Sequence, residues 1–407
     1  MVKQSFSRTH ESREIKTIPD LLRLSNLYDN AVYYLGETAA RANKGSYNSW
    51  FIAEISAILG VHDDGVHPDW IEDLKRYECS HYTLVHLSKK IASLPSQEPL
   101  DVQHFEGLFQ DIVGRARYDL AFNTKKLFDY PPAMQIELSK ACNLKCPFCY
   151  QANDDFKKSI IAKQAFMDIE FFKRLIDASK GKVPYIILAS RGEPLMHPQF
   201  SEMIEYLRDG FLDVKVNTNG MFLTEQLCTL ILDHVDTLVI SVDSHEKNVY
   251  ESLRINADFA RLIGNLELLR SVRSKHPRKE EITIRISGVS VPWAEQDYEA
   301  FRNFFQVYAD DVVLVQYVPW EKIYKLQVSK ASTNPCSELW TMLYIWSDGT
   351  INCCDVDNMS TLVGKPLDMS CSDPIGNAWM SPAMQRLRTM HIAGDRESLT
   401  PCRVCPN

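Results

Sequence analysis

Between residues 134 and 318, short β-rich runs alternate with helical stretches, and this alternation constrains the fold more than any other feature of the sequence. Parallel neighbouring strands need a crossover connection, which is usually a helix, so the pattern predicts a parallel α/β sheet. We expect strands at Met134–Leu138, Tyr185–Ser190, Val214–Thr218, Thr237–Val242, Ile282–Val291 and Val312–Val318. We expect the crossover helices at Asp168–Ser179, Phe200–Asp209, Thr224–His234, Phe259–Ser274 and Gln296–Val307. Periodicity leaves open whether the sheet is open or a partial barrel, and in both cases functional residues gather at the carboxyl ends of the strands.

Two further regions flank this segment, and a chain of 407 residues has the length of two or three ordinary domains. Residues 1 to about 130 show helical spacing with almost no strand pattern, and Pro131–Pro132 marks the change of period. From about Pro319 the chain is rich in cysteine and has only short helical or hairpin patterns. We therefore predict a helical domain over 1–130, an α/β domain over 131–319 and a cysteine-rich extension over 320–407, organised by a metal centre.

Charge and cysteine content narrow the class of protein. With 53 acidic against 45 basic residues the formal net charge is −8, which argues against a nucleic-acid partner. The longest apolar runs are strand-sized and Met1–Lys16 lacks the apolar core of a signal peptide, so we expect a cytoplasmic protein with no membrane partner. In a reducing compartment, the 11 cysteines favour metal or redox chemistry over disulfides.

Three of these cysteines, Cys142, Cys146 and Cys149, lie in SKACNLKCPFCYQAN, directly after the first expected strand. Thiols on one loop can converge on a single metal centre, and thiolates suit zinc or an iron–sulfur cluster. Structural zinc takes four ligands, and no fourth cysteine or histidine lies nearby in the sequence. Three ligands on a cubane cluster would leave one iron open for a small molecule. A three-cysteine zinc loop, or unligated buried thiols, is the alternative.

At these residues the chain resembles the radical S-adenosylmethionine (radical SAM) superfamily, whose hallmark is CxxxCxxC with an aromatic residue, here Phe148, before the last cysteine. The resemblance implies a partial (β/α)6 TIM-like barrel and a four-iron, four-sulfur (4Fe-4S) cluster on Cys142, Cys146 and Cys149. It implies that the open iron binds S-adenosylmethionine, whose reductive cleavage gives a 5′-deoxyadenosyl radical that abstracts hydrogen from the substrate. It also implies an electron donor of the flavodoxin or ferredoxin type.

Further segments match the family in order along the chain. Gly192, Glu193 and Pro194 in SRGEPLMHP match the GGEP-type motif, which in the family holds the methionine amino group. Gly192 permits close backbone approach and Glu193 offers an acceptor for an ammonium. Arg191 stands where the family often has a small residue, and a surface position and a role at the site are both open.

The remaining cofactor-binding candidates follow later strands. They are Asn217 and Asn219 in VNTNG, Ser241 and Asp243 in ISVDS, Arg254 in YESLR, and Ser287, with Arg285 and Gly288, in IRISGVS. In the family, polar side chains at these strand ends reach the ribose, the methionine carboxylate and the adenosyl group. Turn chemistry is the alternative, because Asn-Gly and Asp-Ser end strands in any protein.

The tail reads PCSELWTMLYIWSDGTINCCDVD, then IGNAW, and finally TPCRVCPN. It resembles the auxiliary-cluster extension of the family called SPASM, or twitch in its shorter form. The full SPASM pattern continues with more cysteines beyond the CxxC, whereas the sequence here stops at Asn407. We therefore expect one auxiliary 4Fe-4S cluster, on Cys336, Cys354, Cys402 and Cys405. Cys353 is the alternative to Cys354, and Cys371 is a further candidate for either place. A four-cysteine zinc site is the alternative to the cluster.

These resemblances predict a radical SAM oxidoreductase or isomerase. We expect a small-molecule substrate (a sugar, an aminocyclitol or a nucleotide-linked intermediate) that undergoes dehydrogenation, or epimerisation if Cys353 or Cys371 lies near the pocket as a hydrogen-atom donor. No catalytic residue beyond these and the cluster ligands is assignable. The alternatives are a maturase that cross-links or epimerises a ribosomal peptide, and a non-catalytic zinc-binding interaction protein. Many peptide maturases carry a recognition domain of winged-helix type, which needs strands that residues 1–130 do not predict.

Overall fold

The computed structural model describes residues 114–115, 117–152, 156, 165–208, 210–327 and 332–406. The chain divides into two units, Met1–Leu127 and Phe128–Asn407. The helices expected before residue 114 lie outside the described residues, so the helical domain over 1–130 and the domain boundaries remain predictions. The last described helical residue of the first unit is Thr124, and Lys125 follows it with a positive φ of 62°.

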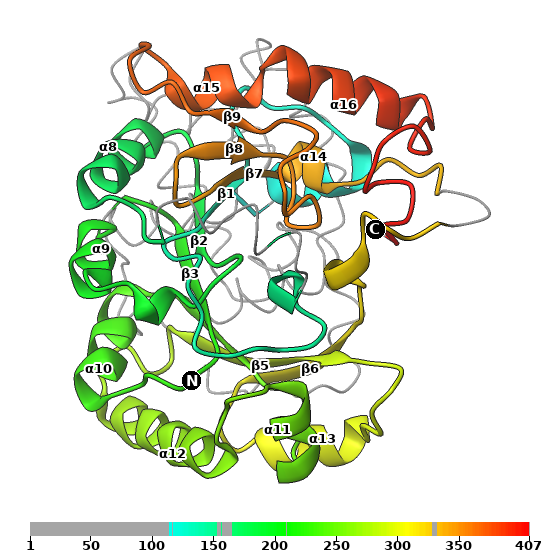
Figure 1. Cartoon of the computed structure of the whole chain (residues 1–407). Coiled ribbons are helices and arrows are strands. Elements are labelled where there is room, and N and C mark those ends of the chain that lie inside the picture. Colours follow the sequence, from blue (N-terminus) through cyan, green and yellow to red (C-terminus); the bar gives the residue numbers. More distant parts are fainter. Residues whose placement is uncertain are drawn as a thin grey trace, which may run out of the picture. The chain divides into compact units, whose positions relative to one another are not determined.

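A nine-stranded sheet forms the centre of the second unit, in the order β6-β5-β4-β3-β2-β1-β7-β8-β9. Its first six strands are β1 (Ala133–Ile136), β2 (Tyr185–Leu188), β3 (Asp213–Thr218), β4 (Thr237–Ser241), β5 (Thr283–Ser290) and β6 (Asp311–Gln316). These six are parallel and stand in sequence order. The predicted parallel α/β sheet is confirmed, and Figure 1 shows it curving as a partial TIM-like barrel.

Helices cover the outer side of this curved sheet (Figure 1). They are α8 (Ile169–Ser179), α9 (Phe200–Tyr206), α10 (Glu225–His234), α11 (Lys247–Leu253), α12 (Phe259–Lys275) and α13 (Tyr298–Phe305). Asp168, Thr224, Asp258 and Asp297 begin α8, α10, α12 and α13, and each side chain accepts a hydrogen bond from a backbone amide of the first turn. The short helix α11 was not predicted.

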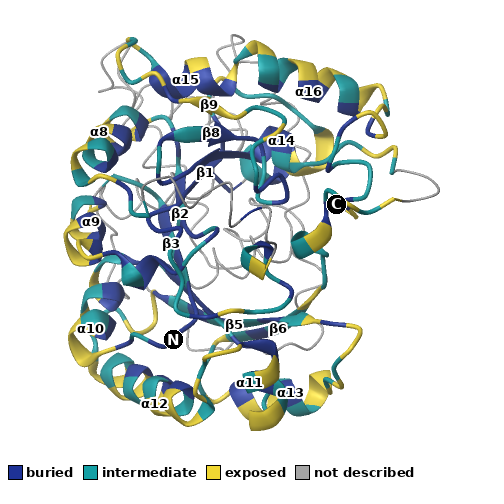
Figure 2. Ribbon diagram, in the orientation of Figure 1, coloured by how far each residue is buried: buried dark blue, intermediate teal, exposed yellow. Residues whose placement is uncertain are grey.

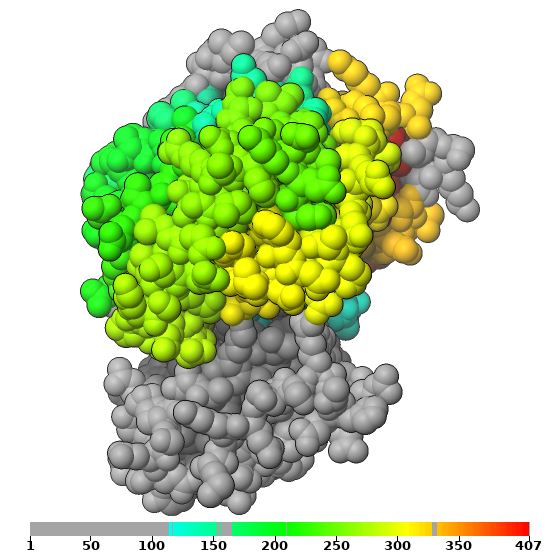
Figure 3. Space-filling model, turned by 90° about the horizontal axis from the view of Figure 1, so that it is seen from below, coloured from blue at the N-terminus to red at the C-terminus, as the bar shows by residue number. Residues whose placement is uncertain are grey.

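The core lies between these helices and the sheet. In α8 the fully buried side chains Phe172, Leu175 and Ile176 repeat at helical spacing on one face. Figure 2 shows β1 to β4 largely dark blue and the outer faces of the helices mainly yellow. In the view from below, the green-to-yellow segment that holds α11, α12 and α13 forms the outer surface of this side (Figure 3). None of the helices in the described part of the chain has the length and apolarity needed to span a membrane.

The cysteine-rich extension continues the same sheet. Its elements are η4 (Trp320–Lys322), α14 (Glu338–Thr341), β7 (Met342–Ile345), β8 (Thr350–Asn352), β9 (Lys365–Pro366), α15 (Pro374–Trp379) and α16 (Pro382–Ile392). Strand β7 pairs in parallel with β1, Ala133 opposite Met342, and then turns back at Gly349 into the antiparallel strand β8. The hairpin was predicted, but its place beside β1 was not, because the two segments lie far apart in the sequence.

Candidate active site

A cavity of about 280 Å³, which we call the larger cavity, lies at the carboxyl ends of strands β1 to β6. The candidate residues that line this larger cavity are Cys142, Cys146, Phe148, Cys149, Arg191, Gly192, Glu193, Asn217, Asn219, Ser241, Arg254 and Ser287. Six strand ends therefore bring together the motifs that the sequence places more than a hundred residues apart. Asp243 and Arg285 are absent from the described lining: Asp243 is buried beside it, and Arg285 pairs with Asp311.

The loop after β1 presents the three cysteines of CxxxCxxC to this cavity. Backbone amides of the loop point at two of the sulfurs: Leu144 N lies 3.4 Å from Cys142 Sγ, and Gln151 N lies 3.5 Å from Cys149 Sγ. Burial raises the pKa of Cys142 to about 11, so this thiol stays protonated unless a cationic centre displaces its proton. Such a loop is suited to thiolate ligation of a metal cluster.

The loop after β2 places Gly192 and Glu193 against the cysteine loop. A Cβ on Gly192 would lie 2.3 Å from the carbonyl oxygen of Ser139 and 2.5 Å from that of Ala141, so only glycine fits. Glu193 begins the short helix η3 (Pro194–Met196) and is 3% exposed. Burial raises its pKa to about 7, although its carboxylate accepts three hydrogen bonds.

Two of those three bonds come from the end of β3. The Thr218 hydroxyl lies 2.7 Å from Oε1 of Glu193, and the Asn219 amide lies 2.8 Å from Oε2. The Asn219 side-chain amide in turn donates to Asn143 of the cysteine loop at 2.8 Å. Asn217 also lines the cavity, and its buried Oδ1 has no hydrogen-bond partner in the described structure. This orphaned acceptor fits a ligand that brings a donor such as an ammonium or a hydroxyl.

Asp243 and Arg254 form a buried ion pair, with Arg254 Nε 2.7 Å from Asp243 Oδ2. The other carboxylate oxygen of Asp243 accepts the backbone amide of Val289 at 2.8 Å, which holds the pair against β5. Arg254 lines the larger cavity, and although burial raises the pKa of Cys146, the charge of Arg254 offsets part of that rise. Asp243 therefore positions Arg254, and Arg254 brings positive charge to the cysteine loop.

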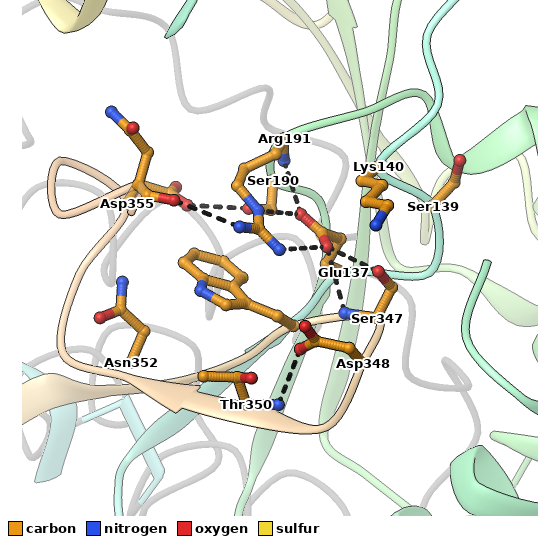
Figure 4. Close-up of polar contacts among 12 residues, drawn as sticks. Glu137, Ser139, Lys140, Ser190, Arg191, Ser347, Asp348, Thr350, Asn352 and Asp355 are labelled. Carbon is orange, nitrogen blue, oxygen red and sulfur yellow. Dashed lines mark hydrogen bonds and ion pairs between the residues drawn. The ribbon is translucent and has the colours of Figure 1, made fainter. Parts of the chain in front are cut away.

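Arg191 is buried, so the surface position considered from sequence is wrong. Its guanidinium forms a two-pronged ion pair with Glu137, which directly follows β1, at 2.5 and 2.7 Å. Ser347, two residues after the end of β7, donates to the same carboxylate through its hydroxyl at 2.9 Å and its backbone amide at 3.1 Å. Figure 4 shows Arg191 and Ser347 both directed at Glu137. Trp346 packs on the guanidinium, with its ring centroid 4.2 Å from the Arg191 Cζ.

Asp355 was not singled out in the sequence, yet it lines the larger cavity from the extension. Its carboxylate accepts from Gln135 Nε2 at 2.7 Å and from Ser190 Oγ at 3.1 Å (Figure 4). It directly follows Cys354 in the chain. The sequence shows that Asp355 follows the cysteine pair in CCDVD, but it does not show that Asp355 reaches the cavity, because this depends on the pairing of β7 with β1.

A second cavity lies within the extension, and five cysteines line it: Cys336, Cys353, Cys354, Cys402 and Cys405. The four predicted auxiliary ligands are thus brought together, and Cys353 lies beside them. The Asp357 amide lies 3.4 Å from Cys354 Sγ, the same arrangement that serves Cys142 in the first loop. This resemblance favours Cys354 over Cys353 as the ligand.

Cys353 and Cys371 are both absent from the described lining of the larger cavity. Cys353 is 1% exposed in the second cavity, whereas Cys371 lies before α15, where Asn377 Nδ2 lies 3.3 Å from its sulfur. The condition set for a hydrogen-atom donor, a place near the pocket, is therefore not met by either cysteine in the described structure.

Two family models match the chain in the segments that carry these sites. The model described as "Radical SAM superfamily" matches residues 136–292, and the "Iron-sulfur cluster-binding domain" called SPASM matches residues 336–406. The chain belongs to the radical SAM superfamily. Its radical SAM domain holds the larger cavity, and its SPASM domain holds the second cavity.

Relatives agree with this membership. Mycofactocin maturase MftC of Mycobacterium tuberculosis is 27% identical over 143 residues, 35% of this chain and 35% of its own length. GTP 3′,8-cyclase of Chlorobaculum tepidum is 25% identical over 162 residues, 39% of this chain and 47% of its own. The matches thus span less than half the length of these relatives. Among solved structures, Streptococcus suis SuiB bound to precursor peptide SuiA has a similar fold, with a TM-score of 0.52 and 13% identity over 89% of this chain and 87% of that one.

The two domains imply S-adenosylmethionine and 4Fe-4S clusters as cofactors. The residues present fit these cofactors. The three-cysteine loop would leave one iron of a 4Fe-4S cluster without a protein ligand, in the cavity that the unpartnered Oδ1 of Asn217 also lines. The second cavity offers enough thiols to ligate every iron of a second cluster. In the described ranges, no group of three or more histidine, cysteine or carboxylate side chains converges closely enough for a single metal ion.

Proposed function

We propose that this radical SAM enzyme cleaves S-adenosylmethionine reductively and removes a hydrogen atom from a substrate bound in the larger cavity. The observation that carries the proposal is the convergence of the cysteine loop, Gly192, Glu193 and Asn217 on that one cavity. When bound, the first cluster and S-adenosylmethionine supply a 5′-deoxyadenosyl radical, and the auxiliary cluster supplies an acceptor for one electron.

The residues of the chain would bind and orient these groups. Cys142, Cys146 and Cys149 would hold the first cluster. Oε2 of Glu193 accepts the Asn219 amide and keeps a second lone pair for the methionine ammonium. Asn217, Ser241 and Ser287 would serve the polar groups of the carboxylate and ribose, and Phe148 shields the cysteine loop by packing against Leu253 and Val291.

Dehydrogenation is the outcome that the cavity favours. Removing a hydrogen atom from a CH–OH group leaves a carbon radical, and loss of one proton and one electron then completes its oxidation to a carbonyl. The carboxylate of Asp355 lines the cavity and is the base placed to take that proton. Epimerisation would need a hydrogen-atom donor, and in the described lining the thiols are those of the cluster loop alone.

A small molecule is the favoured substrate, because a cavity of about 280 Å³ must hold S-adenosylmethionine as well as the reacting group. A peptide side chain is the second candidate. The fold likeness to SuiB, solved with a precursor peptide, extends over 89% of this chain and favours it. A flavodoxin or ferredoxin is the proposed electron donor.

Anaerobic reconstitution with iron and sulfide tests the proposal. The wild-type protein should bind about eight irons and form 5′-deoxyadenosine under reduction, while Cys142→Ala should lose about half of the iron and all of the cleavage. Retention of both by Cys142→Ala would refute the proposed radical chemistry.

Substrate class is tested by deuterium transfer. Perdeuterated cell extract is divided into low-molecular-weight metabolites and peptides, and 5′-deoxyadenosine formed with each fraction is analysed by mass spectrometry. Deuterium in the product of the metabolite fraction supports the small-molecule proposal, whereas deuterium from the peptide fraction alone supports a maturase.

A further inference from the structure

His391, on α16, has one ring nitrogen with a hydrogen-bond partner and one without. Its side chain is 1% exposed and lines the second cavity. The backbone amide of Cys336 donates to Nδ1 at 3.2 Å. Nε2 is buried and has no hydrogen-bond partner in the described structure. A buried polar atom without a partner is uncommon and needs an explanation.

The bond from Cys336 fixes which nitrogen carries the proton. Because the Cys336 amide donates to Nδ1, that nitrogen must present its lone pair. A neutral imidazole then has its hydrogen on Nε2, which is therefore a donor and not an acceptor. The missing partner must be an acceptor inside or beside the second cavity.

Sulfur is the acceptor that this cavity offers in quantity. Five cysteines line it, and most of the other lining residues in the described structure are apolar. Glu338 also lines it, but its carboxylate accepts the Tyr344 hydroxyl and makes no hydrogen bond with His391 Nε2 in the described structure. Arg396 is a donor, and it holds the backbone carbonyls of Asn334, Cys402 and Cys405.

We propose that His391 Nε2 donates a hydrogen bond to a sulfur atom of the auxiliary cluster and thereby raises the reduction potential of that cluster. The proposal rests on the auxiliary cluster that the SPASM domain implies, and it does not depend on the identity of the substrate. His391 is a positioning and tuning residue, since it neither ligates iron nor contacts the larger cavity in the described lining.

The geometry argues against His391 as an iron ligand. A histidine that ligates a metal through one nitrogen usually donates the hydrogen of the other nitrogen to a carbonyl or a carboxylate. In His391 the other nitrogen, Nδ1, is an acceptor, so Nε2 keeps its hydrogen and cannot bind iron without breaking the bond to Cys336.

The effect on potential follows from charge. Reduction adds an electron to the cluster, and part of this negative charge resides on its sulfurs. A donor N–H stabilises the more negative state and so raises the potential, as hydrogen bonds to cluster sulfurs do in general. A higher potential would make the auxiliary cluster a better acceptor for the electron that the proposed dehydrogenation releases.

The test is a redox titration of the reconstituted full-length protein, followed by electron paramagnetic resonance. In every sample Cys142, Cys146 and Cys149 are replaced by alanine, so that the first cluster cannot form and the signal comes from the auxiliary cluster. His391→Leu should shift its midpoint to more negative potential, and His391→Gln, whose amide can both accept and donate, should shift it less. His391→Leu with full iron content and an unchanged midpoint would overturn the proposal.

A second measurement keeps the proposal testable if His391→Leu fails to bind the cluster. Protein labelled with ¹⁵N-histidine is reduced, and pulsed electron paramagnetic resonance measures the coupling between the cluster spin and nitrogen. A weak coupling that disappears in His391→Gln or moves to the unlabelled amide is expected. No coupling, or the strong coupling of a directly bound nitrogen, would overturn it. Neither measurement needs cleavage of S-adenosylmethionine, so a failure of this proposal can be distinguished from a failure of the proposed function.

Discussion

Arg191 Nε lies 2.5 Å from Glu137 Oε2, and this buried ion pair stands where the carboxyl ends of β2 and β1 meet. Ser347, in the turn after β7, donates to the same carboxylate. One buried carboxylate therefore joins the loop that precedes Gly192 to the first hairpin of the SPASM domain. This contact adds to the pairing of β7 with β1 in holding the extension beside the larger cavity.

Breaking the pair from one side should be costly. Arg191→Met leaves the Glu137 charge buried without its partner, and we expect a loss of about 3–5 kcal/mol in unfolding free energy. The double variant Arg191→Met/Glu137→Leu removes both charges and should recover most of that loss. Urea unfolding of the cluster-free proteins measures both. Equal destabilisation of the single and double variants would show that the charges of Arg191 and Glu137 do not stabilise each other.

Gly192 should not tolerate a side chain. The Cβ of Gly192→Ala would lie 2.3 Å from the Ser139 carbonyl oxygen, so the loop that carries Glu193 must move. We expect loss of S-adenosylmethionine binding, measured by equilibrium dialysis of the reconstituted protein. Gly264→Ala is the matched control: no atom lies within 4 Å of its added Cβ in α12, and it should stabilise the protein by about 0.5–1 kcal/mol.

Binding of S-adenosylmethionine should weaken as the pH falls below 7. Burial raises the pKa of Glu193 to about 7, so below that pH the free protein holds this group mainly protonated. The methionine ammonium needs the carboxylate, and binding must then release a proton. The dissociation constant should therefore rise about tenfold for each unit of pH below 7 and level off above it, up to about pH 8, where the α-amino group of the ligand itself loses its proton.

Glu193→Gln supplies the control for this titration. The amide keeps the shape but cannot ionise, so binding should be weak and independent of pH from about 5.5 to about 7, where the α-amino group of the ligand stays protonated. Calorimetry in two buffers of different ionisation enthalpy measures the proton released. A wild-type dissociation constant that does not change with pH would contradict the role assigned to Glu193.

Local patterns were sufficient to predict the first half of the site. The alternation of strands and helices predicted that β1 to β6 are parallel, and CxxxCxxC, GEP and VNTNG each lie at or soon after the carboxyl end of a strand, so the parallel sheet brings them together. Each of these motifs consists of residues that are close together in the sequence, so it can be recognised without knowledge of the fold. They could not predict α11, whose seven residues Lys247–Leu253 are too short for a clear helical period.

Contacts between distant segments account for what was not predicted. The pairing of β7 with β1 joins segments about 200 residues apart, and Ser347 and Asp355 reach the site only because of it. His391 lies 55 positions from Cys336, and nothing in its local sequence marks it. Arg191 likewise becomes informative only through Glu137, which lies 54 positions away in the sequence.

The two adjacent cysteines of the SPASM domain should behave differently. Cys354 Sγ accepts the Asp357 amide, as thiolate ligands in the first loop accept amides, so Cys354→Ala should lose about four of about eight irons. Cys353→Ala should keep full iron content, measured by colorimetric analysis of the reconstituted protein. The reverse result would assign the ligand to Cys353.

Asp355 should separate radical formation from product formation. Asp355→Asn keeps the size of the side chain but cannot take a proton from the substrate radical in the larger cavity. We expect normal iron content and normal 5′-deoxyadenosine formation without substrate, with product formation reduced by about 10²–10⁴-fold. Ser190→Ala removes one hydrogen bond to Asp355 but keeps the carboxylate, and its loss of product should be much smaller. Equal product formation by Asp355→Asn and the wild type would show that another group takes the proton, whereas loss of iron would show that Asp355 supports the auxiliary cluster.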